Sequence, residues 1–177
     1  MHPDFIASPE KEKERYLKHQ NDVTDLGYKN FVSPIINTVL TSFSKSAKGL
    51  DFGAGTGPVI STILKEKGYK TKLYDPFFHS NKNVLTETYD YIICCEVIEH
   101  FNYPKKEFEL LKKLLKPGGK LICMTHLLPK LNSLKNWYYL RDFTHVFFYS
   151  EATVNYIKDT FRFKEALIDD RLIVLSV

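Results

Sequence analysis

The feature that most constrains the fold of this chain is a glycine-rich loop between an apolar strand and a helix. Asp51 lies in a strand-like run, Gly53, Gly55 and Gly57 follow, and Pro58 opens a helical segment. Glycine tolerates positive φ and has no Cβ, so the loop can turn sharply and let a ligand reach the backbone. The next helix presents unpaired N–H groups and the positive end of its dipole. The loop therefore predicts a nucleotide-type site in an α/β fold.

The spacing of the glycines narrows the choice of nucleotide. The dinucleotide fingerprint needs a glycine three residues after Gly55, but Pro58 stands there and the third glycine is Gly57. The carboxylate of Asp51 disfavours a pyrophosphate and suits a ligand that carries an ammonium group. The Asp-x-Gly-x-Gly-x-Gly pattern resembles motif I of the class I S-adenosylmethionine (SAM) methyltransferases. The simpler alternative is a tight strand-to-helix turn that binds no ligand.

Three further features follow in the order found in that family. Asp75 ends the predicted strand 70–74, where a carboxylate can accept hydrogen bonds from both ribose hydroxyls; the alternative is a turn residue before Pro76. Residues 89–95 form an apolar strand, and Pro-Gly-Gly at 117–119 precedes another. The resemblance covers residues 49–177 and implies SAM as the cofactor. It implies contacts from Asp51, Gly53, Gly55, Gly57, Asp75, Cys95 and Glu96, with Phe77 or Phe78 against the adenine or in the pocket wall.

One part of the family pattern is missing. The segment between Asp75 and Tyr89 is too short for a helix, a third strand and a loop. We therefore expect the third strand to be shortened or absent, with residues 83–86 as its only remnant. The acidic residue that contacts adenine in the family follows that strand, and Glu87 is its best substitute here.

These features predict a single Rossmann-like α/β domain over residues 1–177. Residues 46–177 would form the SAM-binding core, a mostly parallel sheet that closes with an antiparallel C-terminal hairpin. Residues 1–45 would form two helices, at about 10–25 and 31–43, that act as a lid over the acceptor pocket. The first of these segments resembles the opening of an uncharacterised methyltransferase subgroup, and a solvated helix is the alternative. The candidate acceptor contacts are Tyr16, His19 and Tyr28.

The segment Glu96-Val97-Ile98-Glu99-His100 carries candidate chemistry. On a helical turn, residues three and four apart share a face, so Glu96 can converge with Glu99 and with His100. Carboxylates with an imidazole suit Mg²⁺ or Mn²⁺. The pattern resembles the metal site of the small-RNA 3′-terminal 2′-O-methyltransferases and of the ubiquinone-pathway O-methyltransferases. That resemblance implies the ligands Glu96, Glu99, His100 and His145, with His126 competing for the fourth position.

The same Glu-x-x-Glu-His pattern also occurs in family members that use no metal. In that case His145, oriented by Asp142, is the first candidate for a general base, and His100 is the second. A third interpretation makes His145 a histidine of the aromatic segment 137–149 without a chemical role.

Composition limits the class of protein to which this chain can belong. A chain of 177 residues with 44% hydrophobic and 26% charged residues is typical of a globular domain. No apolar run reaches the length of a membrane span, and the three cysteines form neither a disulfide framework nor a zinc spacing. We expect a cytoplasmic SAM-dependent methyltransferase, monomeric or homodimeric, acting on an oxygen or nitrogen of a small-molecule or RNA acceptor. The alternative is a non-catalytic SAM-fold binding protein.

Overall fold

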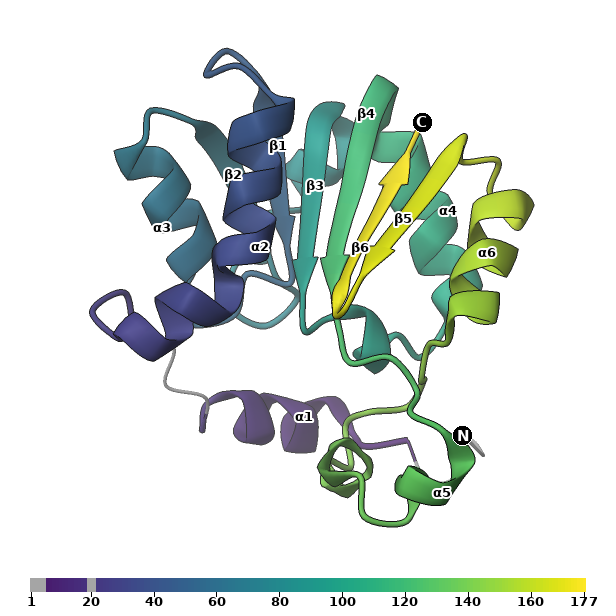
Figure 1. The fold of residues 1–177 in the computed structure, drawn as a ribbon. Helices are drawn as coiled ribbons and strands as arrows, with labels where there is room; N and C mark the ends of the chain where they lie inside the picture. Colours follow the sequence, from purple (N-terminus) through teal and green to yellow (C-terminus); the bar gives the residue numbers. More distant parts are fainter. Residues whose placement is uncertain (1–5, 19–21) are drawn as a thin grey trace.

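The chain folds around one mixed sheet. The computed structural model describes residues 6–18 and 22–177. In these residues six strands pair in the order β2-β1-β3-β4-β6-β5 (Figure 1). The first four are parallel, and β6 runs antiparallel to both β4 and β5, which confirms the expected closing hairpin. The strands are β1 (Lys48–Phe52), β2 (Lys70–Tyr74), β3 (Tyr89–Cys95), β4 (Leu115–Met124), β5 (Glu165–Asp169) and β6 (Leu172–Ser176).

Helices cover both faces of the sheet (Figure 1). The helices α2 (Leu26–Ser42) and α3 (Val59–Glu66) enclose one apolar core, and α4 (Pro104–Leu114) and α6 (Glu151–Thr160) enclose the other. Each buries an apolar stripe of helical spacing, as on α4, where Phe108, Leu111 and Leu114 face inward. The two cores hold the sheet rigidly and leave its strand ends available to build a site.

The N-terminal helices differ from their predicted bounds. The first helix, α1, spans Pro9–Tyr16 and begins at Ser8, whose hydroxyl accepts from the backbone N–H of Lys11. It is shorter than the predicted segment 10–25. Asp25 caps α2 instead, because its carboxylate accepts from the N–H groups of Gly27 and Tyr28. The second helix therefore begins before the predicted residue 31.

The third strand of the family pattern is absent from the described residues, as expected. After β2, Asp75 and His79 form an isolated antiparallel bridge. Residues 83–86, the predicted remnant of the strand, lie instead in the 3₁₀ helix η2 (Lys82–Thr86). The sheet consequently ends at β2, so no strand lies beyond the carboxylate of Asp75.

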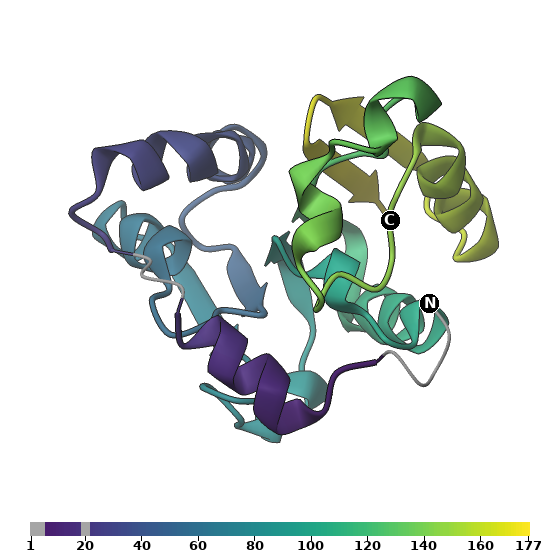
Figure 2. The same cartoon turned by 90° about the horizontal axis from the view of Figure 1, so that it is seen from below.

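Several short elements gather at the carboxyl ends of the parallel strands. Figure 1 shows α1 below this end of the sheet, and Figure 2, seen from below, shows α1 crossing it. The same end holds η3 (Ile98–His100) after β3, and α5 (Leu131–Leu134) and η4 (Tyr138–Arg141) after β4. No helix among the described residues is long and apolar enough to cross a membrane.

Candidate active site

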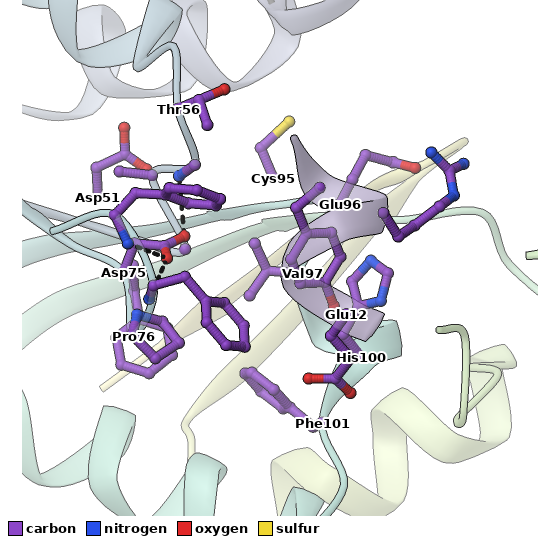
Figure 3. Close-up of a pocket in the computed structure, with 18 of the residues that line it drawn as sticks. Glu12, Asp51, Thr56, Asp75, Pro76, Cys95, Glu96, Val97, His100 and Phe101 are labelled. Carbon is purple, nitrogen blue, oxygen red and sulfur yellow. Dashed lines mark hydrogen bonds between the residues drawn. The ribbon is translucent and has the colours of Figure 1, made fainter. Parts of the chain in front are cut away.

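A cavity of about 920 Å³ opens at the carboxyl ends of the parallel strands. Its wall comes from the loop after β1, the ends of β2 and β3, and the segment around η4, with α1 across one side (Figure 3). Ligands of open α/β sheets bind at this end of the strands, because the loops and helix N-termini converge there. The cavity contains most of the residues that the sequence predicts to be functional.

The glycine loop forms the first wall of this cavity. Gly53 and Gly55 have φ values of 84° and 62°, which only glycine adopts without strain. A Cβ on Gly53 would overlap the side chain of Val97. The N–H groups of Gly53 and Ala54 donate to the carbonyl of Tyr74 at 2.8 and 3.1 Å. The loop is thus tied to β2, and Gly57 lines the cavity beyond it.

Asp51 places a buried carboxylate beside the loop. The side chain is 4% exposed, and Ser61 on α3 donates its hydroxyl to Oδ2 at 2.7 Å. Burial raises the pKa of Asp51 to about 6, although the Ser61 hydrogen bond opposes the shift. A buried carboxylate with one neutral donor is poorly compensated. A cationic group in the cavity would therefore be favoured here.

Asp75 lies at the end of β2 and faces the same cavity (Figure 3). Its Oδ1 accepts from the N–H groups of Phe77 and Phe78 at 2.8 and 3.1 Å, and its Oδ2 accepts from Gly55 at 3.0 Å. These bonds fix the carboxylate against the glycine loop. Asp75 therefore organises the turn and also presents a carboxylate to the cavity, so the two interpretations of this residue are compatible.

A buried tyrosine in the cavity wall joins two carboxylates. The Tyr139 hydroxyl lies 3.1 Å from Glu96 Oε2 and 3.0 Å from Thr125 Oγ1, and it also contacts Glu99 Oε1. Burial raises the pKa of Glu96, and burial together with the charge of Glu96 raises the pKa of Glu99. Within the described part of the chain, Glu96 Oε1 and Glu99 Oε2 are buried without a hydrogen-bond partner. One phenol proton cannot satisfy both carboxylates.

Two histidines stand next to this group. The Nδ1 atoms of His100 and His145 lie 2.9 and 2.8 Å from the carbonyls of Thr144 and Tyr139, and the ring centroids are 4.8 Å apart. A carbonyl only accepts, so each Nδ1 carries the proton and each lone pair is on Nε2. Burial lowers the pKa of His145, which favours its neutral form. One ligand atom each from Glu99, His100 and His145 lies within 4.8 Å of the others.

Two predictions about this cluster need correction. Glu96 is outside the three-residue group, because it precedes η3 and has a φ of 52°, so it does not share a helical face with the others. Asp142 does not orient His145 through its carboxylate, which instead accepts from Thr144 N–H at 3.0 Å and from Arg15 at 2.7 Å.

The carbonyl of Tyr139 holds His145 in place. His126 is also outside the group, and its Nε2 lies 2.8 Å from the hydroxyl of Tyr138.

The predicted adenine contact from Glu87 is wrong. Its carboxylate pairs with Lys48 and with Lys72, the latter at 2.6 Å. Lys48 is the first residue of β1, so Glu87 lies toward the amino ends of the strands and does not line the cavity. Attraction to these two lysines accounts for its position.

The remaining predicted contacts divide into two groups. Tyr16, Tyr28, Phe77 and Cys95 all line the cavity. The Tyr16 ring lies between Phe77 and His100, at centroid distances of 5.8 and 5.3 Å. His19 lies outside the described residues. The sequence reasoning missed Tyr139, Arg141 and Glu107 as cavity residues, because no local motif marks them.

The fold and the site together define a nucleotide-binding α/β protein, and comparison with known proteins gives its family. A family model described as a methyltransferase domain matches residues 24–159. The chain therefore belongs to the methyltransferase domain family. A search of curated proteins finds no significant sequence match.

Solved structures support this assignment at the level of the fold. An O-methyltransferase family protein from Burkholderia thailandensis superposes with a TM-score of 0.63 at 12% identity, covering 93% of this chain and 61% of that one. Human N-acetylserotonin methyltransferase in complex with SAM superposes with a TM-score of 0.60 at 15% identity, covering 84% of this chain and 53% of that one. A SAM-dependent methyltransferase from Thermotoga maritima, described as a possible histamine N-methyltransferase, superposes with a TM-score of 0.52 at 14% identity. It covers 95% of this chain and 94% of that one. The chain thus spans less than two thirds of the first two proteins.

Proposed function

We propose that this chain binds SAM and transfers its methyl group to an oxygen or nitrogen of a small-molecule acceptor. The observation that carries the proposal is the placement of two buried carboxylates, Asp51 and Asp75, on either side of the glycine loop in one cavity. Asp51 suits the ammonium group of the cofactor's amino acid, and Asp75 suits the ribose hydroxyls. The loop that carries Gly53, Gly55 and Gly57 lines the same cavity.

The charge of the cavity favours a small acceptor over RNA. Among the described residues, two arginines and six carboxylate residues line it, so a polyanionic backbone would meet mostly negative charge. The carboxylates are Glu12, Asp51, Asp75, Glu96, Glu107 and Asp142. The structurally similar N-acetylserotonin methyltransferase and the possible histamine N-methyltransferase have names that refer to small molecules.

His145 is the proposed general base, with His100 as the second candidate. Methyl transfer from a sulfonium needs an acceptor in line with the methyl group and sulfur, and alignment supplies much of the rate. A hydroxyl or ammonium acceptor must also lose a proton. The neutral His145 imidazole, with its lone pair on Nε2 and its ring in the cavity wall, is suited to accept it.

A divalent metal is a second candidate, favoured by the orphaned Glu99 Oε2 and the proximity of Glu99, His100 and His145. One carboxylate and two imidazoles are a reasonable donor set for Mn²⁺. A bound metal would lower the pKa of an acceptor hydroxyl. The residues that would hold it are these three, and Glu96 would remain with Tyr139.

We further propose that α1 acts as a lid within a single domain. Tyr16 contacts Phe77 and His100, so α1 joins the cofactor side of the cavity to the second candidate base. An acceptor would then be enclosed among Tyr16, the two histidines and η4. Tyr28 lies on the opposite side, stacked on Phe31 with centroids 5.6 Å apart.

Calorimetric titration with S-adenosylhomocysteine (SAH) tests the cofactor site. One titration contains EDTA and the other contains excess Mn²⁺. Binding that is equal in both supports base-assisted chemistry without a metal, and binding strengthened by Mn²⁺ supports the metal site. Absence of binding in both would contradict the proposed function.

Turnover separates an enzyme from a non-catalytic binding protein. The protein is incubated with methyl-labelled SAM and a panel of phenols, alcohols and amines, and label transfer is counted.

The metal site is tested by comparing Glu99→Gln with His126→Gln, a residue outside the three-residue group. If a metal is used, Glu99→Gln should weaken Mn²⁺ affinity by more than the roughly 10–100-fold that loss of an outer hydrogen-bond partner costs.

A further inference from the structure

The absence of the third strand leaves open which residue recognises the adenine base. Asp51 and the glycine loop lie toward one face of the sheet, because Ser61 on α3 holds the Asp51 carboxylate. Phe52 and Tyr74 belong to the core on the opposite face, with α4. A ligand bound at Asp51 through its amino acid and at Asp75 through its ribose therefore extends its base over the α4 side.

An aromatic surface lies in that direction. The ring centroids of Phe52 and Tyr74 are 5.1 Å apart, and those of Phe52 and Phe101 are 6.2 Å apart. All three side chains line the cavity. A flat base has apolar faces and stacks on aromatic rings, so this side of the cavity offers a surface for adenine.

Glu107, in the first turn of α4, lies beside this surface and lines the same cavity. Among the described residues no side chain forms a hydrogen bond or ion pair with its carboxylate. Burial raises the pKa of Glu107, opposed only by the nearby charge of Lys106. Burial raises the pKa of the Tyr74 phenol, and the nearby carboxylates of Glu107 and Asp75 raise it further, so both lie close to this ring.

We infer that Glu107 recognises adenine by accepting a hydrogen bond from its 6-amino group. The inference rests on the proposed function and assigns this role to α4 in place of the missing strand. Adenine presents a donor at this position, whereas hypoxanthine presents a carbonyl acceptor. A carboxylate accepts from the first and repels the second. Glu107 thus selects the base, while Asp75 holds the sugar.

The test compares binding of SAH with binding of S-inosylhomocysteine, in which a carbonyl replaces the 6-amino group. The wild-type chain should bind SAH about ten- to a hundredfold more tightly, the range expected for a charged hydrogen bond. Glu107→Gln should lose most of this preference, because its amide can either accept or donate. Glu109→Gln is the matched control, since Glu109 lies on the same helix but its partner is Lys105 at the surface.

Three results would overturn the inference. Equal wild-type affinity for both compounds would show that the amino group is not recognised. An unchanged preference in Glu107→Gln would assign the recognition to another residue. A wild-type chain that binds neither compound would remove the proposed function as well, and so is distinct from the first two. Thermal unfolding confirms that each variant folds, and Glu107→Asp, with its carboxylate withdrawn by one methylene, replaces Glu107→Gln if needed.

Discussion

Arg15 on α1 and Asp142 after η4 form an ion pair at 2.7 Å, although 127 residues separate them in the sequence. The pair joins the two sides of the cavity, since both residues line it. It holds α1 across the carboxyl ends of the strands (Figure 2). The position of the proposed lid therefore depends on a contact between α1 and the segment after η4.

Arg15→Gln should loosen α1 and accelerate SAH release. The Arg15 side chain is about one third exposed, so solvent screens the ion pair. We expect the variant to lose about 0.2–1 kcal/mol of the free energy that holds α1 in place. Stopped-flow dissociation measures the rate. Lys13→Gln on the exposed side of the same helix is the control. An Arg15→Gln variant with the dissociation rate of wild type would show that the pair does not hold the lid.

The affinity for SAH should fall as the pH drops through about 6. Burial raises the pKa of Asp51 to about 6, so below that pH its carboxyl is neutral and no longer attracts the ligand's ammonium group. Titrations from pH 5 to pH 7.5 measure this step. Asp51→Asn should bind SAH weakly at every pH, whereas Asp75→Asn should still show the fall in SAH affinity below about pH 6. A step that survives in Asp51→Asn would belong to another group.

The raised pKa of Asp51 has the opposite effect on the stability of the unliganded protein, which should increase at low pH. The folded pKa of Asp51 lies above the ordinary value of about 3.9, so the folded state binds the proton more tightly than the unfolded chain. This contribution to stability is present below pH 4 and is lost as the pH rises through 6. Chemical denaturation of wild type and Asp51→Asn should reveal it as a difference confined to that range.

Asp75→Asn should weaken SAH binding by about 1–3 kcal/mol, because hydrogen bonds to the ribose lose their charge. The asparagine carbonyl can still accept from Phe77 and Phe78 N–H, so the turn should persist, but the NH₂ group cannot accept from Gly55 N–H. Calorimetry gives the affinity and thermal unfolding checks the fold. Asp159→Asn on the exposed surface of α6 serves as the control. Unchanged affinity would refute the ribose role.

His145→Gln should reduce turnover by about 10²–10⁴-fold, the usual contribution of a general base. Its affinity for SAH should stay close to that of wild type, since the proposed role concerns the acceptor. Single-turnover methylation of an acceptor identified in the panel measures the effect. His126→Gln retains the proposed base and should remain active. Full activity in His145→Gln would shift the role to His100.

Local sequence signals predicted the framework well. The glycine loop, the apolar runs of β1 and β3, and the short segment after Asp75 each depend on a few neighbouring residues. Such signals act wherever the segment lies in the fold. They predicted the sheet, its closing hairpin and the loss of the third strand, together with Asp51 and Asp75 in one cavity.

Side-chain partners could not be predicted in the same way. A helical-face argument grouped Glu96 with Glu99 and His100, but the chain turns at Glu96 with positive φ and separates it from them. Sequence order suggested Glu87 as the adenine contact, whereas two lysines on neighbouring strands hold it elsewhere. For Glu87 the deciding interactions come from residues far away in the sequence.

The sequence by itself determined the order of the elements and the glycine turn, because these follow from local conformational preference and from runs of apolar residues. Only the tertiary structure decided that Tyr139 joins Glu96 to Glu99, that Arg15 reaches Asp142, and that Glu107 faces the cavity. Those positions depend on how helices and strands far apart in the chain pack together. Packing is a property of the whole fold.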